Sequence, residues 1–416
     1  MLTETQWYVR SVTEFGVRRM TVDERRARLA LRHRLAVGAR SDDPVVIAEG
    51  MVALHATDPS TVFLSTAARM VTPSVEPLQR ALYDDRRLVR TLCMRRTMFV
   101  LPVPMVPVVQ AACTDALVPG ERRRTLAMLE QNGVPDADAH LRALEVQTLA
   151  AIGEHGEITG AELSKLVPAL RKQIRVGDGT KWEGTIGLTT RVLFLLSTEQ
   201  RIVRGRPKGG WTSSQYRWSP MSKWLPETVT PPSADEARVE LGRQWLRAFG
   251  PATVADLKWW SGLTLGQVRK AVAALDVEEV DLDGVPGLVL ADDVDSTPRS
   301  EPWIALLPSL DPTTMGWQQR AWYLGEHGQT LFDTNGNAGP TVWCDGRIVG
   351  GWAQRKTGEV VFRLLDDIGR EAATAIEVEA VRLTEWLGDV RVTPRFPTPL
   401  QRQLAQGELG TSPRLA

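Results

Sequence analysis

The chain has 416 residues, of which 43% are hydrophobic and 24% are charged. These are globular values, and the length exceeds what one ordinary hydrophobic core holds, so two to four domains are expected. Fifty Lys and Arg side chains balance fifty Asp and Glu side chains. Net charge therefore excludes general attraction to nucleic acid, and a nucleic-acid-binding protein of this composition must gather its basic groups locally.

Cysteine spacing and hydropathy narrow the class of protein further. Cys93, Cys113 and Cys344 lie far apart without a CxxC pair, which excludes a zinc ribbon and argues against a disulfide framework. The histidines show no metal-ligand spacing. No apolar run approaches the length of a membrane span, and the N-terminus lacks the apolar core of a signal peptide. We expect no metal, no cofactor, no membrane association and a cytoplasmic location.

The N-terminal third is rich in helix signals. Thr21 and Glu24 have the spacing of a capping box, and the stretch ERRARLALRHRLA that follows predicts an amphipathic helix with a basic face. Residues 77–92 predict another helix. Residues 96–104, RTMFVLPVP, predict a short buried strand that ends at the prolines. The apolar stripes of these segments are expected to form core.

Residues 51–69, MVALHATDPSTVFLSTAAR, place polar groups between two structural elements. An apolar run ends at Leu54, the segment His55-Ala56-Thr57-Asp58-Pro59 follows, and a helix with an apolar face then runs to Arg69. Junctions of this kind are where scaffolds place reactive groups.

Residues 139–224 predict a winged helix, because three helices precede a hairpin. The helices are expected at about 139–153, from the capping pair Thr159 and Glu162, and at 185–200, and the hairpin at 201–220. The first strand and turn of this hairpin are basic through Arg201, Arg204, Arg206 and Lys208. They form either a wing that contacts phosphates or a solvated turn with scattered charges.

The order of helices and hairpin repeats over residues 236–290. Thr253 and Thr264 are expected to cap the second and third helices, and Gly262 to turn the chain between them. The hairpin here is acidic, EEVDLDGVPGLVL, so it is a poor candidate for phosphate contact. We interpret this unit as structural.

Short strands dominate the C-terminal part. Strands are predicted at 340–344 and 347–352, joined by Asp345-Gly346, and at 360–365, with a helix at about 366–387 and a loose tail after Pro394. The predicted fold class is α+β, with tandem winged-helix modules and a small C-terminal β-barrel or curled sheet. The expected domains are a helical or winged-helix module at 1–135, a second winged helix at 136–230, a third at 231–298 and the barrel with its terminal helix at 299–416.

Four segments together resemble the AlkZ/YcaQ-type winged-helix DNA glycosylases: HATDP with a helix ending in Arg, RTMFVLP, LLPSLDPTTMGWQQR and DGRIVGGW. That family carries Gln-Ala-Gln-Asp/Glu-Pro in the first segment, and its catalytic pair is Gln-x-Gln or Gln-x-Asp. Here His55 and Thr57 occupy those two positions, so the frame matches and the catalytic residues differ. The resemblance implies tandem winged helices and a β-barrel that cradle duplex DNA, and in some relatives protection of antibiotic producers from their own alkylating compounds.

The resemblance also implies roles at the first segment. His55 is expected to accept a proton from the attacking water, Thr57 to orient that water, and Asp58 either to supply negative charge to the sugar or to cap the next helix. A histidine base predicts excision that rises with pH through roughly 6–7. The alternative for His55 is a satisfied, partly buried structural histidine.

The expected partner is double-stranded DNA carrying alkylated bases, bound by a monomer in the nucleoid. Binding is expected to weaken steeply with salt, through residues on the wing, beside the strand at 96–104 and in the C-terminal part. The candidate DNA contacts are Arg95, Arg96, Arg201, Arg204, Arg206, Lys208, Trp317, Gln318, Arg320, Arg355 and Lys356. The alternative for Trp317 is a packed side chain beside a capped turn. Two other functions remain open: a non-catalytic winged-helix DNA-binding regulator, which the loss of both glutamines favours, and a protein that sequesters a genotoxin in the barrel.

Overall fold

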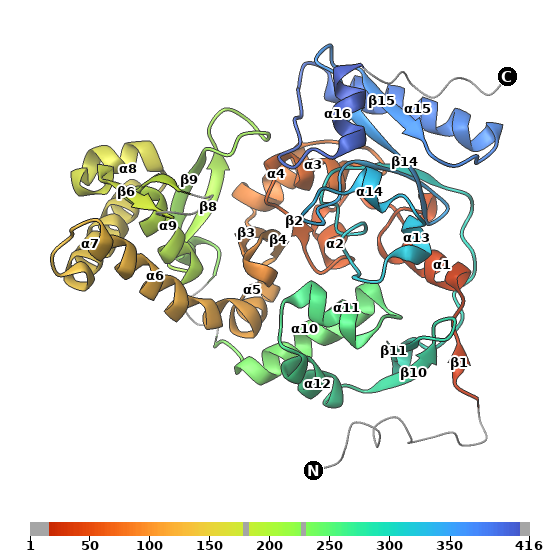
Figure 1. Ribbon diagram of the computed structural model, residues 1–416, viewed down its shortest axis with the longest axis horizontal. Helices are drawn as coiled ribbons and strands as arrows, with labels where there is room; N and C mark the ends of the chain where they lie inside the picture. Colours follow the sequence, from red (N-terminus) through yellow and green to blue (C-terminus); the bar gives the residue numbers. More distant parts are fainter. Residues whose placement is uncertain (1–15, 178–182, 226–229, 408–416) are drawn as a thin grey trace.

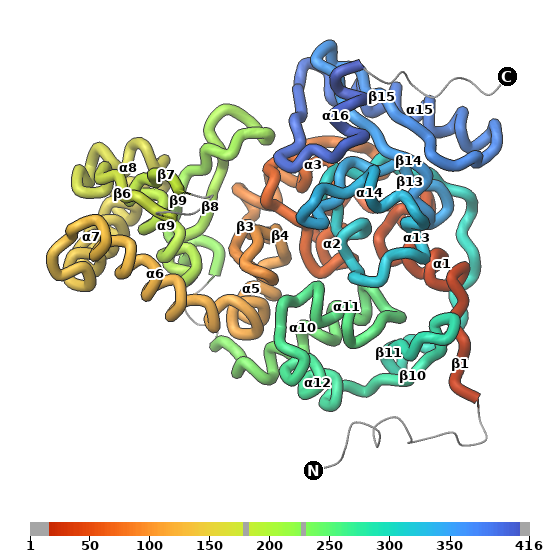
Figure 2. Tube along the Cα trace, viewed as in Figure 1, coloured from red at the N-terminus to blue at the C-terminus, as the bar shows by residue number. Residues whose placement is uncertain are grey.

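The computed structural model describes residues 16–177, 183–225 and 230–407. One lobe, formed by the elements from α6 to β9, stands apart from a larger body that contains the other units (Figure 1). The chain enters this lobe through α5 and α6 and returns from it to α10, so the larger body is built from both ends of the sequence (Figure 2).

The N-terminal unit combines short helices with a three-stranded sheet in the order β2-β4-β3. Its elements are α1 (Val22–Arg32), α2 (Pro44–Glu49), β2 (Leu54–His55), α3 (Pro59–Ala67), α4 (Glu76–Gln79), β3 (Leu88–Leu92) and β4 (Met98–Pro102). The hydroxyl of Thr21 caps α1, as predicted, by accepting from the backbone N–H of Glu24.

The helix predicted over residues 77–92 is wrong in its second half. A π-helical turn, Arg80–Asp84, follows α4, and residues 88–92 form strand β3. All five residues of β3 are buried. A strand buried on both faces shows no alternation of polar and apolar residues, so its sequence pattern cannot be told from that of a buried helix.

One continuous helical run links the lobe to the larger body. It covers Val103–Gln131, includes α5 (Val106–Val109) and α6 (Val118–Gln131), and is long and apolar enough to cross a membrane by length and composition alone. The sequence was expected to contain no apolar run of membrane-spanning length, so this run differs from that expectation. A single run of this kind is weak evidence for a membrane span, because a helix that belongs to the fold passes the same test.

The lobe has its own hydrophobic core. Its further elements are α7 (Ala137–His155), β5 (Ile158–Thr159), α8 (Gly160–Leu166), β6 (Gln173–Val176), β7 (Gly184–Gly187), α9 (Leu188–Thr198), β8 (Ile202–Pro207) and β9 (Tyr216–Pro220). The predicted order of three helices and a hairpin is present, and β5 adds a third strand beside β9. Residues 185–187 belong to strand β7 rather than to the predicted helix, because they pair with β6 and α9 begins only after Gly187.

The third unit has the same order of helices and hairpin and belongs to the larger body. It contains α10 (Ala234–Phe249), α11 (Val254–Ser261), α12 (Leu265–Ala273), β10 (Val277–Asp281) and β11 (Pro286–Leu290), with β1 (Arg18–Arg19) parallel to β10. The predicted caps are present: Thr253 and Thr264 each form a capping box, and Gly262 ends α11 with a positive φ of 75°.

The C-terminal unit is a four-stranded antiparallel sheet in the order β12-β13-β14-β15. Its elements are β12 (Ile304–Leu307), α13 (Ala321–Leu324), α14 (Gly328–Leu331), β13 (Thr341–Cys344), β14 (Arg347–Gln354), β15 (Val360–Leu364), α15 (Arg370–Leu387) and α16 (Pro399–Gln406). Asp345 and Gly346 form the predicted hairpin turn, with φ of 47° and 80°. Over the described residues this sheet is open, so the predicted barrel is not formed there.

The tail after Pro394 was predicted to be loose, but its residues Pro399–Gln406 form helix α16, and residues 408–416 lie outside the described structure. Leu400 and Leu404 are four residues apart, lie on one face of this helix and are buried. Helix α16 packs against β14, so the tail closes one side of the C-terminal sheet. Buried apolar residues of the N-terminal, third and C-terminal units form one common core.

Candidate active site and nucleic-acid interface

The segment from His55 to Asp58 is fixed between a strand and a helix. Leu54 and His55 pair with Val100 and Phe99 of β4. Asp58 then caps α3: its Oδ1 atom accepts from the Ser60 backbone N–H at 2.9 Å and from the Ser60 hydroxyl at 2.6 Å. Its Oδ2 atom accepts from the backbone N–H of Arg395 at 3.1 Å. Both carboxylate oxygens thus have structural partners, which favours the capping role.

His55 is 5% exposed and lies with its ring edge against Phe99, 4.9 Å between ring centroids. Its Nδ1 atom has no hydrogen-bond partner in the described structure. Burial, together with the positive charge of Arg95, lowers the pKa of His55 to about 3. The imidazole is therefore neutral at physiological pH in the free protein. A pKa of about 3 lies well below the reference pKa from which a rise of excision through pH 6–7 was expected, because the reference pKa applies to a solvated side chain.

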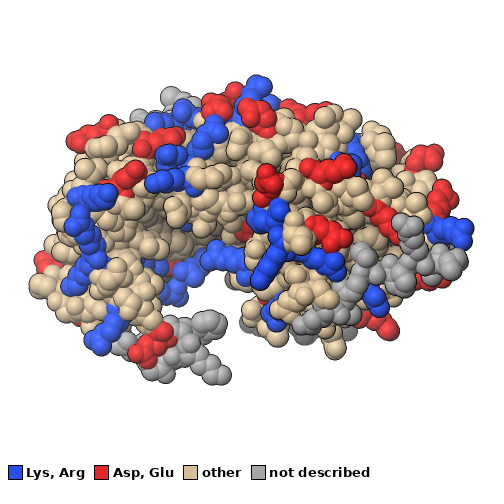
Figure 3. All heavy atoms as spheres, turned by 90° about the horizontal axis from the view of Figure 1, so that it is seen from above, with Lys and Arg blue, Asp and Glu red and all other residues tan. Residues whose placement is uncertain are grey.

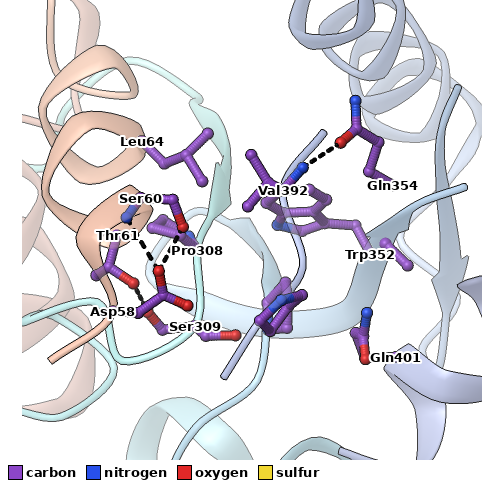
Figure 4. Close-up of a pocket in the computed structure, with 13 residues that line it drawn as sticks. Asp58, Ser60, Thr61, Leu64, Pro308, Ser309, Trp352, Gln354, Val392 and Gln401 are labelled. Atoms are coloured by element: carbon purple, nitrogen blue, oxygen red, sulfur yellow. Dashed lines mark hydrogen bonds between the residues drawn. The ribbon is translucent and has the colours of Figure 1, made fainter. Parts of the chain in front are cut away.

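Thr57 is the more accessible member of the pair. It is partly exposed, whereas its neighbours Ala56 and Asp58 are buried. Its carbonyl accepts from the Arg395 guanidinium at 3.4 Å, so the C-terminal segment after α15 reaches the junction. A small cavity beside this junction has room for about one water molecule and lies between α3 and the C-terminal sheet (Figure 4). Ser60 and Ser309 line it from one side, and Trp352 and Gln401 line it from the other.

Several predicted DNA contacts are engaged inside the fold. Trp317 is 3% exposed and donates its indole N–H to the Phe249 carbonyl at 3.0 Å, so its prediction as a groove residue is wrong. The apolar indole packs inside a cluster of aromatic side chains there. Gln318 keeps an exposed side chain, and its backbone N–H donates to Asp256.

Other predicted cationic contacts have acidic partners. Arg96 pairs with Glu121 at 2.8 Å and Arg206 pairs with Asp84 at 2.8 Å. The ion pair of Arg355 with Glu359 is 2.9 Å long. The basic face expected on α1 is also largely used internally, because Arg28 is buried against Glu24 and Asp293. Charge that is already neutralised contributes less to attracting phosphate. Three predicted contacts, Arg201, Lys208 and Lys356, are exposed to solvent.

Two predicted contacts, Arg95 and Arg320, share an aromatic platform. Their guanidinium carbons lie 4.3 and 4.9 Å from the ring centroid of Trp259. No carboxylate lies within 4 Å of either group among the residues that the structure describes. Burial and the neighbouring Arg320 lower the pKa of Arg95 to about 10, so Arg95 remains cationic at neutral pH. The positive charge of Arg95 also acts on His55 and contributes to lowering its pKa.

A second pair, Arg90 and Arg204, also contacts this region of the structure. Arg90 donates from Nη1 to the Ala56 carbonyl at 2.9 Å, and Arg204 lies 4.8 Å above the Trp218 ring. Burial lowers the pKa of Arg204 to about 10, with a smaller contribution from Arg90. Arg90 was not predicted from the sequence. The available signal was a single arginine inside the apolar run LVRTL.

The surface between the lobe and the larger body is hollowed. Figure 3 shows this hollow from above, with Lys and Arg side chains along its roof. Among the described residues, no group of three or more His, Cys, Asp and Glu side chains is placed to hold a metal ion. The sequence-predicted residues that the structure brings together are thus His55, Thr57, Asp58 and Arg95, with Arg90 added by the tertiary structure.

Comparisons with known proteins agree with this architecture. The family model described as "DNA glycosylase AlkZ-like" matches residues 48–386. The interstrand DNA cross-link repair glycosylase of Streptomyces sahachiroi is 28% identical over 174 residues, which cover 40% of this chain and 47% of that protein. The matched region therefore spans about half the length of this relative. The solved structure of Streptomyces sahachiroi DNA glycosylase AlkZ superposes with a TM-score of 0.68 and 21% identity, over 91% of this chain and 99% of that one.

The fold combines helical units around a strand-to-helix junction, with a basic hollow beside it. The chain belongs to the AlkZ-like DNA glycosylase family, because the family model covers most of its length and includes the segment from His55 to Asp58.

Proposed function

We propose that this chain is a monofunctional DNA glycosylase that removes N-alkylated purines, N7-alkylguanine or N3-alkyladenine, from duplex DNA. The observation that carries the proposal is the position of His55 and Thr57. They occupy the family's catalytic positions at a strand-to-helix junction, near arginines that have no carboxylate partner among the described residues. Family membership and the basic hollow support DNA as the partner.

This reaction needs little catalytic assistance from the protein. An N7- or N3-alkylated purine is already cationic, so the bond between C1′ of the sugar and the base nitrogen breaks with its electron pair leaving on the base. The base departs neutral, water adds its oxygen to C1′, and a water proton passes to solvent. The transition state carries positive charge on the sugar, so the group that holds the water should itself be uncharged.

His55 suits this requirement as a neutral group. Its low pKa makes it a weak proton acceptor, but the uncharged imidazole can hydrogen-bond the water as the amides of the Gln-x-Gln relatives do. The hydroxyl of Thr57 is placed two residues further, on the more accessible side, and would orient the same water. Asp58 supports both by fixing the start of α3.

We further propose that the two helix-and-hairpin units are winged helices and that a monomer of the protein cradles the duplex in the cytoplasm, at the nucleoid. Bulky natural-product adducts are included among the substrates, with a role in self-resistance to an alkylating antibiotic. The printed name of the Streptomyces relative, an interstrand cross-link repair glycosylase, supports this extension.

A non-catalytic DNA-binding regulator is the second candidate. The burial of His55 and the absence of both family glutamines favour it. Sequestration of a genotoxin in a barrel receives less support, since the C-terminal sheet is open over the described residues.

The two functions are separated by incubating the protein with a duplex that carries N7-alkylguanine and then treating the DNA with hot alkali, which breaks the strand at abasic sites. Strand breaks that depend on the protein and persist in excess chelator would support a metal-independent glycosylase. Tight binding without strand breaks would reject the enzyme and leave the regulator.

A further inference from the structure

We propose that Arg90 and Arg204 form a binding site for one backbone phosphate of the DNA strand that runs beside His55 and Thr57. The inference deepens the proposed function, on which it rests for the identity of the ligand as duplex DNA. It assigns a residue, Arg90, that the sequence analysis did not single out, and it places one strand of the DNA between the lobe and the larger body.

The two arginines come from different units and meet at one strand pair. Arg90 lies on β3 of the larger body and Arg204 on β8 of the lobe, and these two strands pack together. Arg204 donates from Nη1 to the Met98 sulfur at 2.9 Å. The carbonyl of Met98 in turn accepts from the Ala56 backbone N–H at 2.8 Å, while Arg90 holds the Ala56 carbonyl. Both guanidinium groups are thus fixed against the candidate catalytic segment.

The pair lacks a counter-charge. Within the described part of the chain, neither guanidinium has a carboxylate within 4 Å. By contrast, two neighbouring arginines have an acidic partner: Arg191 pairs with Glu121 and Arg206 with Asp84. Like charges that are buried together without an anion are costly. The arrangement is therefore suited to an anion that arrives with a ligand.

Hydrogen-bond donors of the pair remain open for that anion. Among the described residues, the N–H groups on Nη2 of Arg90 and on Nε and Nη2 of Arg204 donate no hydrogen bond, and Nε of Arg90 is buried without a partner. The buried hydroxyls of Tyr83 and Tyr216 also lack a hydrogen bond of good geometry, and the Arg90 guanidinium carbon lies over the Tyr216 ring, 5.0 Å from its centroid. Arginine recognises phosphate oxygens through two parallel N–H groups. A phosphodiester offers the acceptors that these donors lack.

The site also bears on positioning. Arg90 donates to the Ala56 carbonyl, and in this proposal the same guanidinium also binds the phosphate. A DNA strand bound there would therefore lie at a fixed distance from His55 and Thr57. Arg90 is thus a positioning residue in this proposal, and Arg204 supplies the second half of the clamp from the lobe.

The first test measures how the affinity of the full-length protein for an undamaged duplex depends on salt. Arg204→Gln and Arg90→Gln should each lower the slope of log affinity against log salt by about 0.9, the value for one lost phosphate contact. The double variant should lose the same amount and not twice as much, because both groups bind one phosphate. Arg204→Lys should keep the slope, since it keeps the charge. Arg142→Gln is the matched control: it removes one surface charge from α7 that is ion-paired with Asp138.

The second test locates the phosphate on DNA. Duplexes in which one phosphate is replaced by a neutral methylphosphonate should reveal a position where the wild-type protein loses affinity and Arg204→Gln does not. If Arg204→Gln binds with the wild-type salt slope and loses only thermal stability, the pair is structural and the inference fails while the proposed function stands. If the wild-type protein does not bind duplex DNA at all, the proposed function fails as well.

Discussion

Arg69 and Asp311, which are 242 residues apart in the sequence, form a fully buried bidentate ion pair, with N–O distances of 2.7 and 2.9 Å. Arg69 follows the helix that Asp58 begins, and Asp311 lies in the LLPSLDPTT segment. The Ser65 hydroxyl and the Thr313 backbone N–H also donate to Asp311. This ion pair thus joins two of the segments that carry the family resemblance. The joint fixes α3 at the end opposite to the candidate site.

Removing one member of this joint should destabilise the protein strongly. Arg69→Met leaves the Asp311 carboxylate buried and unpaired, which typically costs about 3–5 kcal/mol. The measurement is the free energy of unfolding from a denaturant titration. Arg69→Met with Asp311→Leu removes both charges and should recover part of the loss. A single variant that is as stable as the wild type would show that the joint contributes little.

His55 and Thr57 should differ in their effect on catalysis. His55→Ala should lower the single-turnover rate of excision from an N7-alkylguanine duplex by about 10²–10⁴-fold, the range for a group that assists proton transfer or holds the water. Thr57→Ala should cost less, because a second water can replace its hydroxyl. His55→Gln should keep partial activity, since a neutral amide can also hold the water. Wild-type excision by His55→Ala, with folding and binding intact, would make the pair structural.

Asp58 should act as a helix cap and not as a source of negative charge. Asp58→Asn keeps an oxygen that can accept from the Ser60 N–H, so it should retain an excision rate within about threefold of wild type. Asp58→Ala removes the cap and should lower stability by about 1 kcal/mol. Excision assays and thermal unfolding of both variants check this. A large loss of rate in Asp58→Asn with normal stability would instead assign an electrostatic role in catalysis.

The excision rate should not report titration of His55 between pH 6 and 8. Since burial holds the pKa of His55 at about 3, the imidazole is uncharged throughout this range. Single-turnover rates of wild type and His55→Gln should therefore have the same dependence on pH. A step near pH 6.5 that occurs in the wild type and disappears in His55→Gln would contradict the neutral role and show that DNA binding restores an ordinary pKa.

Acid should destabilise the folded protein through its two fully buried histidines. His33 is held by Thr313 at 2.8 Å and by the Ala248 carbonyl at 3.2 Å, and burial and Arg69 lower its pKa to about 3. The unfolded chain binds protons below pH 6.5 and the folded protein does not, so stability is present above that pH and is lost as the pH falls toward 3.

Each such histidine contributes a loss of up to about 1.4 kcal/mol for each pH unit in this window. The free energy of unfolding, measured at pH 7.5 and at pH 5, should therefore fall less in His55→Gln than in the wild type. An equal fall in both proteins would mean that His55 titrates with an ordinary pKa in the folded state.

Local sequence signals determined much of the fold. Caps at Thr21, Thr253 and Thr264 and the turn at Asp345-Gly346 form as predicted, because each depends on hydrogen bonds or backbone angles within four residues. The sequence around His55 also predicted the family, and the family model, which matches residues 48–386, confirms it.

Tertiary structure decided what the sequence left open or gave wrongly. Residues 88–92 became a strand because both of their faces are buried, and the tail became a helix because β14 offers an apolar surface to Leu400 and Leu404. Burial also decided the electrostatics. It keeps His55 neutral and withdraws Trp317 and Arg28 into the interior. It also leaves Arg90 without a carboxylate beside the candidate site. A pattern of residues gives each side chain's chemistry, whereas its protonation and partners depend on which distant segments remove it from water.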